Sequence, residues 1–373
     1  MANTDRLTWV DALRLTAGLS MVALHATADP SGQPWSDYEM SQRVAPILLR
    51  AVFYVARTEL FIIISVFLLM LALDKRPRSY RSCISEQVQR LLVPFAFWTG
   101  FYALYGLIKA QSFGYFDAAL ATVSNPVEWI GFLLLGDVKY HMHFIPTLFA
   151  ILLFFPLYQR AVRFPVLGVW IVFALLVKAE LDSFIYSHFW GNDALPFLVR
   201  LAKILTYVGY GMIAAACYGL IKKYCGKDFV PWIWPCAYVG MLLFMIKLVG
   251  SYKTILTGEY PFDYRAGYWA DFLMPVALFI CAMCLGAKKW PAILSRLAPY
   301  SFGIYLTHPI FLDLAEIYLR DTHLSPIEQV TYKIGFIIPT TFLLVMAMRR
   351  CRPLSWTIGL GPFPSVSRFS LQK

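Results

Sequence analysis

Long apolar stretches separated by short polar segments run along the whole chain. A helix needs about 20 mostly apolar residues to cross a hydrocarbon core of about 30 Å. Ten stretches meet this requirement: 7–26, 46–73, 90–109, 142–159, 164–179, 196–220, 230–249, 268–287, 297–318 and 329–348. Segment 117–136 is interrupted by Asp117, Asn125, Pro126 and Glu128, so we expect an interfacial helix there. The pattern predicts an all-α polytopic membrane protein with about ten transmembrane helices.

The second apolar stretch is longer than one crossing requires and carries several charges. We therefore expect it to be tilted, broken or partly re-entrant. It contains Arg50, Arg57 and Glu59. On a continuous helix, residues two positions apart point to different faces, so Arg57 and Glu59 are expected to have separate partners.

The distribution of basic residues predicts the orientation in the membrane. With the N-terminus inside, the inner segments hold 19 of the 33 Lys and Arg residues, and the outer loops hold eight. Cytoplasmic loops collect Lys and Arg, so we expect both termini in the cytoplasm. We assign 1–351 to a transmembrane domain. Segment 352–373 is rich in Pro, Ser and Gly and is expected to be a poorly ordered cytoplasmic tail.

The composition narrows the class of protein further. Apolar and aromatic residues make up 59% of the chain and charged residues 15%, compared with about 25% charged in soluble domains. This excludes a soluble enzyme and a disordered chain. We attribute the net charge of +11 to topology and to contact with anionic membrane lipid, and expect no nucleic-acid partner. None of the seven cysteines lies in a predicted outer loop, so no disulfide framework is expected.

Ionisable residues inside the first stretch are candidates for function, because they are costly in a membrane. Arg14 and His25 are eleven residues apart, which places them on nearly the same helix face about 16 Å apart along the axis. Asp11 lies three residues before Arg14 and is in range to pair with it. Spacing alone leaves two interpretations open: a functional stripe, or a buried ion pair with His25 as an interface residue.

Three further histidines lie in or beside apolar stretches. His141 and His143 are two apart, which on a helix would separate them by about 200°, so one metal ion would not easily bind both. Tyr305 and His308 lie on one face of the ninth stretch, and Pro309 leaves the carbonyl of Tyr305 without its helical donor. A kink is therefore expected at Pro309. His308 either bonds to the backbone at that kink or takes part in function. We expect no metal site, because no zinc-binding pattern is present.

Arg90, at the inner end of the third stretch, also has two interpretations. Basic residues at inner helix ends are usually topological anchors. Alternatively, Arg90 contributes to a phosphate pocket, since Arg binds phosphate through paired donors. The sequence has no P-loop and no G-x-S-x-G motif. A reaction catalysed by this chain would therefore use His and Arg within the membrane.

These segments together resemble the membrane-bound acyltransferase 3 family. VDALRLTAGLSMVALH matches the family's first-span spacing of a basic residue, ten residues and His, through Arg14 and His25. YHMHFIPTLFAILLFFPL resembles its HLWFL-type segment, with His141 in the His position. RTELFIIISVFLL, which begins with Arg57, and SFGIYLTHPIFL resemble two further family segments. The resemblance covers residues 7–348, and the layout is similar to O-acetyltransferases of the enterobacterial common antigen type.

The resemblance implies a reaction and a set of residues that perform it. Family members move an acyl group from a cytoplasmic acyl-CoA to a glycan hydroxyl at the outer face. It implies His25 as general base, with Arg14 and His141 as further catalytic residues. An inner cluster of Arg14, Arg57 and Arg90 would bind the phosphates of acetyl-CoA or another acyl-CoA. Direct transfer and an acyl-His intermediate both remain open.

The resemblance also implies the partners and the location. His141, Tyr305 and His308 are expected to bind the acceptor, a glycan or lipid-linked oligosaccharide. The expected location is the bacterial inner (plasma) membrane, with other polysaccharide-assembly proteins as further partners. Two other functions remain open on the sequence: a transporter or flippase for a sugar-lipid or organic anion, and a structural partner in polysaccharide assembly.

The chain departs from the family pattern at three points. The family's R-x-x-R at the start of the third span appears as Q-V-Q-R, with only Arg90 kept. Glu59 and Val66 replace the usual Pro and Gly of the second span. If the R-x-x-R pair holds the donor, the missing first Arg bears on donor affinity or identity.

Overall fold

The computed structural model describes residues 7–224, 228–261 and 264–361, and this part of the chain contains helices and no strands. The first half contains α1 (Thr8–Ala26), α2 (Met40–Phe53), η1 (Tyr54–Ala56), α3 (Thr58–Lys75), α4 (Tyr80–Gln87), η2 (Val88–Leu92), α5 (Val93–Phe113), α6 (Phe116–Ser124), α7 (Glu128–Leu134), α8 (Phe144–Leu152), α9 (Phe155–Arg163) and η3 (Pro165–Val169). The second half contains α10 (Trp170–Phe189), α11 (Leu195–Lys223), η4 (Val230–Trp232), α12 (Ile233–Thr257), α13 (Arg265–Cys284), α14 (Ala292–Leu297), η5 (Ala298–Tyr300), α15 (Ser301–Leu319), α16 (Pro326–Arg350), α17 (Arg352–Ser355) and η6 (Trp356–Ile358).

The all-α polytopic fold predicted from the sequence is confirmed. Each of the ten predicted spans falls on one or more helices. Among the described residues, six helical segments are long and apolar enough to cross a membrane, or seven if a bent pair forms one span. Ionisable residues lower the mean hydropathy of α1, α10 and α15, which are not among these six.

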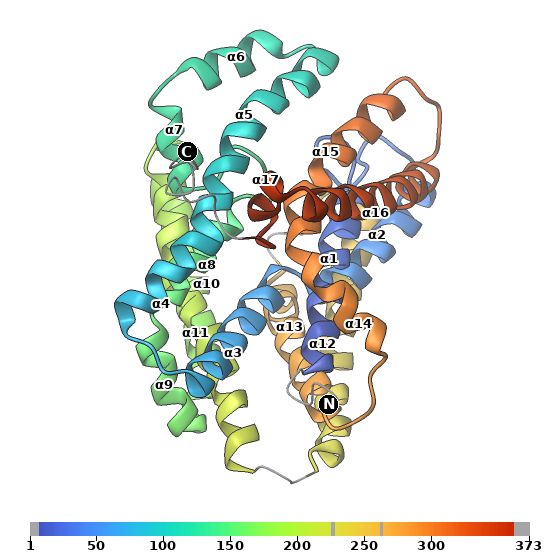
Figure 1. Ribbon diagram of the computed structural model, residues 1–373. Coiled ribbons are helices and arrows are strands. Elements are labelled where there is room, and N and C mark those ends of the chain that lie inside the picture. The colour runs from blue at the N-terminus through green and yellow to red at the C-terminus, as the bar shows by residue number, and fades with distance from the viewer. Residues whose placement is uncertain (1–6, 225–227, 262–263, 362–373) are drawn as a thin grey trace, which may run out of the picture.

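The connections between helices gather at two ends of the molecule (Figure 1). The end of α11, the start of α12 and the link from α13 to α14 lie at the lower end, close to the start of α1. Helices α6 and α7, predicted as one interfacial helix, form two short helices near the upper end. The upper end is the one that the count of Lys and Arg assigns to the outside.

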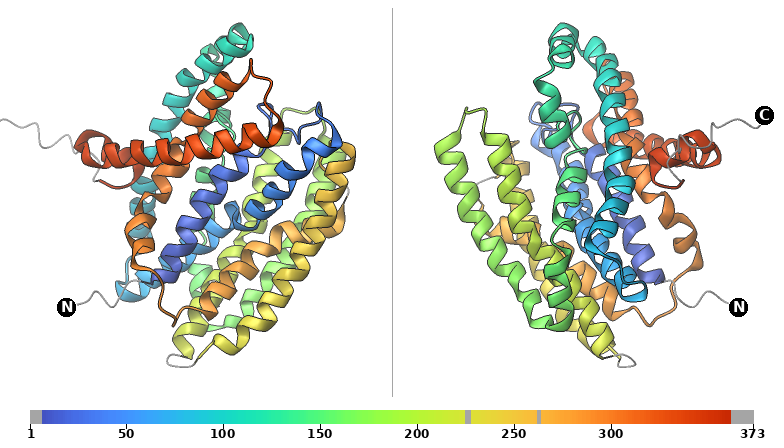
Figure 2. Two further views of the ribbon diagram at one scale, coloured as in Figure 1. Left: turned by 90° about the vertical axis from the view of Figure 1, so that its right-hand side faces the viewer. Right: turned by 60° about the vertical axis from the view of Figure 1, so that its left-hand side comes forward.

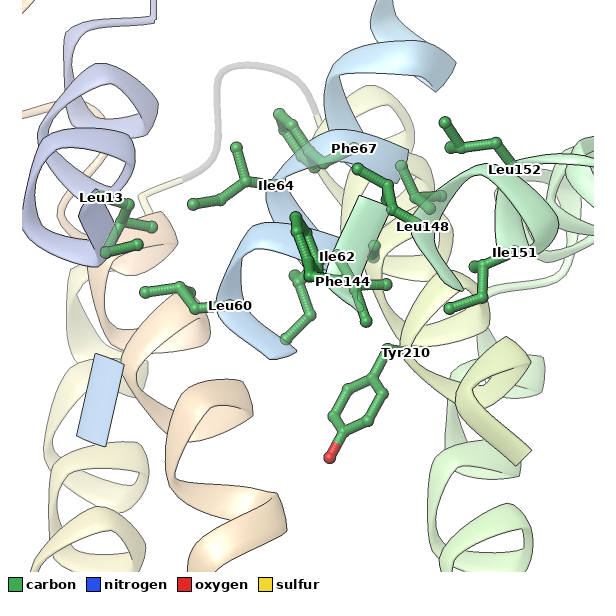
Figure 3. Packing of buried hydrophobic residues seen from close by; sticks show 14 of the residues in the cluster. Leu13, Leu60, Ile62, Ile64, Phe67, Phe144, Leu148, Ile151, Leu152 and Tyr210 are labelled. Carbon is green, nitrogen blue, oxygen red and sulfur yellow. The ribbon is translucent and has the colours of Figure 1, made fainter. Parts of the chain in front are cut away.

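The core lies where α1, α3, α8 and α11 meet (Figure 3). Leu13 of α1, Leu60 of α3, Phe144 of α8 and Tyr210 of α11 are each buried there. α3 is apolar on every face, as expected for a helix surrounded by others. This packing fills the middle of the molecule beside the break between α2 and α3.

Two predicted spans are broken helices. The second stretch continues from α2 through η1 and is interrupted at Arg57, whose backbone is extended with ψ of −167°. A break is one of the three alternatives expected for this stretch, and Arg57 is the residue that precedes the first turn of α3. The fourth stretch divides into α8 and α9, which are bent by 60° relative to each other.

The last long helix lies across its neighbours. α16 runs across α1 and α15 instead of alongside them (Figures 1 and 2). Beyond it, Thr357 and Ile358 of η6 are fully buried. The indole nitrogen of Trp98 donates to the carbonyl of Thr357 at 2.8 Å, which fixes this turn against α5. The rest of the predicted tail, 362–373, lies outside the described residues.

Candidate functional site

Three of the predicted histidines come together although they lie far apart in the sequence. The ring of His25, near the end of α1, stacks on that of His308 with centroids 5.5 Å apart. His141 approaches His308 edge-on at 5.2 Å. The ring centroid of Tyr140 lies 4.4 Å from that of His25, and the ring centroid of Tyr305 lies 5.2 Å from that of His141. The site therefore joins α1, α15 and the segment before α8.

The kink at Pro309 fixes the orientation of His308. Proline has no amide hydrogen, so the carbonyl of Tyr305 lacks its helical donor. His308 Nδ1 lies 2.8 Å from that carbonyl oxygen. A carbonyl oxygen only accepts, so Nδ1 carries the hydrogen, and the neutral ring presents an unprotonated Nε2. The predicted bond into the kink is confirmed, and it leaves Nε2 available.

Several ring nitrogens in this cluster are buried without a hydrogen-bond partner among the described residues. They are Nε2 of His25, Nε2 of His308 and both nitrogens of His141. His25 and His141 line a cavity of about 210 Å³ together with His143, Arg50, Arg57 and Lys203. Buried polar atoms normally have partners, so the unpaired nitrogens of His25 and His141, two of the residues that line this cavity, indicate a place for a ligand. In the described parts of the chain, no group of three or more His, Cys, Asp or Glu side chains is arranged to hold a metal ion.

Cationic side chains also line this cavity, which we call the His cavity. Arg57 pairs with Glu59 (Nε to Oε2, 2.5 Å), and the hydroxyl of Tyr207 donates to Glu59 Oε1 at 2.6 Å. The expectation that Arg57 and Glu59 have separate partners is wrong. Arg57 lies outside the helix in an extended conformation, so its side chain folds back over the first turn of α3. Lys203 of α11 also lines the His cavity.

The segment that carries His141 and His143 is not helical, so both residues reach the same cavity. The hydroxyl of Tyr305 donates to the carbonyl of His141. Arg200 of α11 donates to the carbonyl of His143 at 2.7 Å. Lys203 lies 3.5 Å from His143 Nε2. The separation of about 200° expected for a helix therefore does not apply, and Tyr305 uses its hydroxyl to hold this segment.

A buried charge network anchors the same segment from the other side. Lys139 pairs with Asp313 at 2.5 Å, and Lys109 lies 3.3 Å from Asp313. Lys109 also pairs with Glu316, which lies 4.0 Å from Lys333. Asp313 and Glu316 are on α15, beyond His308. The network therefore holds the two histidine-bearing elements together.

The predicted cluster of Arg14, Arg57 and Arg90 is divided in the structure. Arg57 lines the His cavity, whereas neither Arg14 nor Arg90 is among its lining residues. Arg14 lies on α1 toward its start, 3.8 Å from Asp11 Oδ1. Arg90 is exposed in the π-helical turn η2 that leads into α5. On the predicted orientation, Arg14 and Arg90 face the cytoplasmic side and Arg57 lies deeper.

Sequence reasoning missed Lys203, Arg200 and Tyr140 and did not assign the charge network. A signal was present, since Lys203 and Arg200 are charged residues inside a long apolar stretch. Tyr140 carries no such signal. Together the residues present unprotonated imidazole nitrogens opposite fixed positive charge. This arrangement is suited to removing a proton and stabilising an oxyanion.

The comparisons with known proteins agree with this chemistry. A family model described as an acyltransferase domain matches residues 7–350, nearly the whole of the chain. No curated protein and no solved structure matches the chain. The matched range includes every residue of the His cavity. The chain therefore belongs to the acyltransferase 3 family of membrane acyltransferases.

Proposed function

We propose that this membrane acyltransferase is an O-acyltransferase that transfers an acetyl group from cytoplasmic acetyl-CoA to a hydroxyl of a surface glycan or lipid-linked oligosaccharide. The observation that carries the proposal is the stacked pair of His25 and His308 beside a cationic cavity inside a membrane acyltransferase. The proposed location is the bacterial inner membrane, and glycan-assembly proteins are proposed partners.

In the proposed reaction, an imidazole nitrogen takes the proton of the acceptor hydroxyl. The hydroxyl oxygen attacks the thioester carbonyl, a C–O bond forms, and the C–S bond breaks. The proton then passes to the leaving sulfur of CoA. His25 is the proposed base, because its Nε2 is buried, has no partner among the described residues and lies beside the cavity. Arg57 and Lys203 are positioned to stabilise negative charge on the carbonyl oxygen.

The donor is proposed to enter from the side where α1 begins. Arg14 and Arg90 would bind the phosphates of CoA near that side, and the pantetheine arm would extend toward Arg57. His141 is proposed to orient the acceptor, together with His308. The assignment of Arg14 and Arg90 to the donor can be tested by kinetics. An Arg14 or Arg90 variant should raise the KM for acetyl-CoA with little change in kcat.

The proposal is tested by transfer of labelled acetyl-CoA to envelope glycan in isolated membranes. We expect His25→Ala to lower transfer by at least a hundredfold, since general base catalysis contributes about 10²–10⁴-fold. His323→Ala is the matched control, because His323 is exposed and lies outside the cavity. Transfer by His25→Ala at the wild-type rate, with equal protein in the membrane, would refute the role of His25.

A further inference from the structure

A second cavity, larger than the His cavity, lies beside it between α2, α12 and α13. It has a volume of about 330 Å³, within the range of about 300–1,000 Å³ usual for small-molecule sites. Arg50, Tyr54 and Arg57 line both cavities and form the wall between them. A molecule bound in the second cavity would therefore reach the histidines past these three side chains.

The cavity has the lining of a site for a sugar. Tyr260, Tyr264 and Tyr268 present aromatic rings, against which the apolar face of a pyranose packs. Asp271 and Lys247 form an ion pair at 2.7 Å in the same wall and supply polar groups for hydroxyls. α12 ends and α13 begins beside this cavity, at the end that the charge count assigns to the outside.

The charges of the cavity do not cancel. Arg57 is neutralised by Glu59, and Lys247 by Asp271. Arg50 has no carboxylate within ion-pair distance among the described residues: its Nη1 donates to the carbonyl of Leu24 at 2.9 Å. Its guanidinium lies 5.3 Å from the ring of Tyr260. One guanidinium with unused donors therefore lines an aromatic cavity, and such a group binds carboxylate or phosphate through paired donors.

We propose that this second cavity binds an anionic sugar residue of the acceptor, a uronate or a phosphorylated sugar, with Arg50 as its counter-ion. The proposal rests on the proposed function, because it assigns the acceptor of that reaction. Arg50 holds the anionic group while the sugar packs on the tyrosine rings. The hydroxyl to be acylated then points past Tyr54 toward His25.

The test is equilibrium binding to the purified full chain in phosphatidylcholine nanodiscs. The probes are a fluorescent tetrasaccharide containing glucuronate, the same tetrasaccharide with its carboxyls reduced to alcohols, and a matching tetrasaccharide with a 6-phosphate. We expect both acidic probes to bind the wild type about ten- to a hundredfold more tightly than the reduced probe. The stronger of the two acidic probes identifies the anionic group. Because no acyl donor is present, the result is independent of acyl transfer.

Two variants place the binding in this cavity. Arg50→Gln should reduce binding of the acidic probes to that of the reduced probe, whereas Arg265→Gln, exposed beside the cavity, should not. Gly250 lines the cavity, and a Cβ there would lie 3.3 Å from Tyr264, so Gly250→Leu fills the cavity without changing its charge. We expect Gly250→Leu to weaken binding of every probe, with thermal unfolding confirming that each variant is folded.

Three results would overturn the proposal. The first is equal binding of the acidic and reduced probes, or no binding of either. The second is unchanged binding of the acidic probes by folded Arg50→Gln or Gly250→Leu. The third is loss of probe binding when the nanodiscs contain phosphatidylglycerol, which would assign the cavity to an anionic lipid headgroup.

Discussion

At the scale of single residues, the chemistry depends on which nitrogen of His308 carries the hydrogen. The carbonyl of Tyr305 fixes that hydrogen on Nδ1, and it is available only because residue 309 is proline. The stacked ring of His25 then faces an imidazole whose Nε2 accepts protons. Pro309 thereby acts on the site without lining its cavity.

Replacing Pro309 tests this dependence. Pro309→Ala supplies an amide hydrogen that competes for the carbonyl of Tyr305, so Nδ1 of His308 loses its fixed partner. We expect nitrogen-15 NMR of histidine-labelled protein to show a mixture of tautomers at His308, and kcat to fall about tenfold or more. The KM for acetyl-CoA should remain near its wild-type value.

Pro339→Ala is the control for the Pro309 variant, since Pro339 also lies inside a helix but is exposed on α16. It should leave the histidine spectrum unchanged. A single Nδ1–H tautomer of His308 in Pro309→Ala would contradict the role of the kink.

At the scale of elements, the break between α2 and α3 places a charged residue in the interior. Arg57 is partly buried against the rings of Tyr54 and Phe272, and its charge is balanced by Glu59, which is fully buried. Removing one partner of a buried pair leaves an uncompensated charge, which costs about 3–5 kcal/mol. The pair therefore stabilises this junction only while both partners are present.

This predicts a measurable pattern of stability. Glu59→Ala should lower the free energy of unfolding by about 3–5 kcal/mol, while Arg57→Met with Glu59→Met should recover part of that loss. Denaturant unfolding in detergent micelles measures both. Glu180→Gln, on the exposed face of α10, is the control and should change stability by less than about 0.5 kcal/mol. A double variant less stable than Glu59→Ala would show that the uncompensated charge of Arg57 is not the cause of the loss in Glu59→Ala.

The elements also show how far the sequence could predict the site. Apolar stretches locate the helices, because a bilayer demands long apolar segments. Spacing within one helix indicated His25 and the bond of His308, since both depend on local geometry. The pairing of Arg57 with Glu59 could not be predicted from the sequence. No Pro or Gly marks the break beside these residues, and the position of the break is decided by tertiary packing. The meeting of His141 with His308 likewise depends on contacts between distant segments.

At the scale of the whole molecule, the fold places the histidine site between two ends of different character. One end holds the start of α1 and the links rich in Lys and Arg, and the other holds α6 and α7. The second cavity lies on the outer side of the site on the predicted orientation. The proposed reaction therefore requires the acyl group to pass from one face of the membrane to the other through this protein.

The most direct measurement of this claim uses sealed vesicles of known orientation. Labelled acetyl-CoA, which does not cross membranes, is added to the outside of inside-out or right-side-out vesicles that carry the protein and the glycan acceptor. We expect labelled glycan protected inside the inside-out vesicles, and none with His25→Ala. Label formed only in right-side-out vesicles, or equally by His25→Ala, would contradict transfer across the membrane at this site.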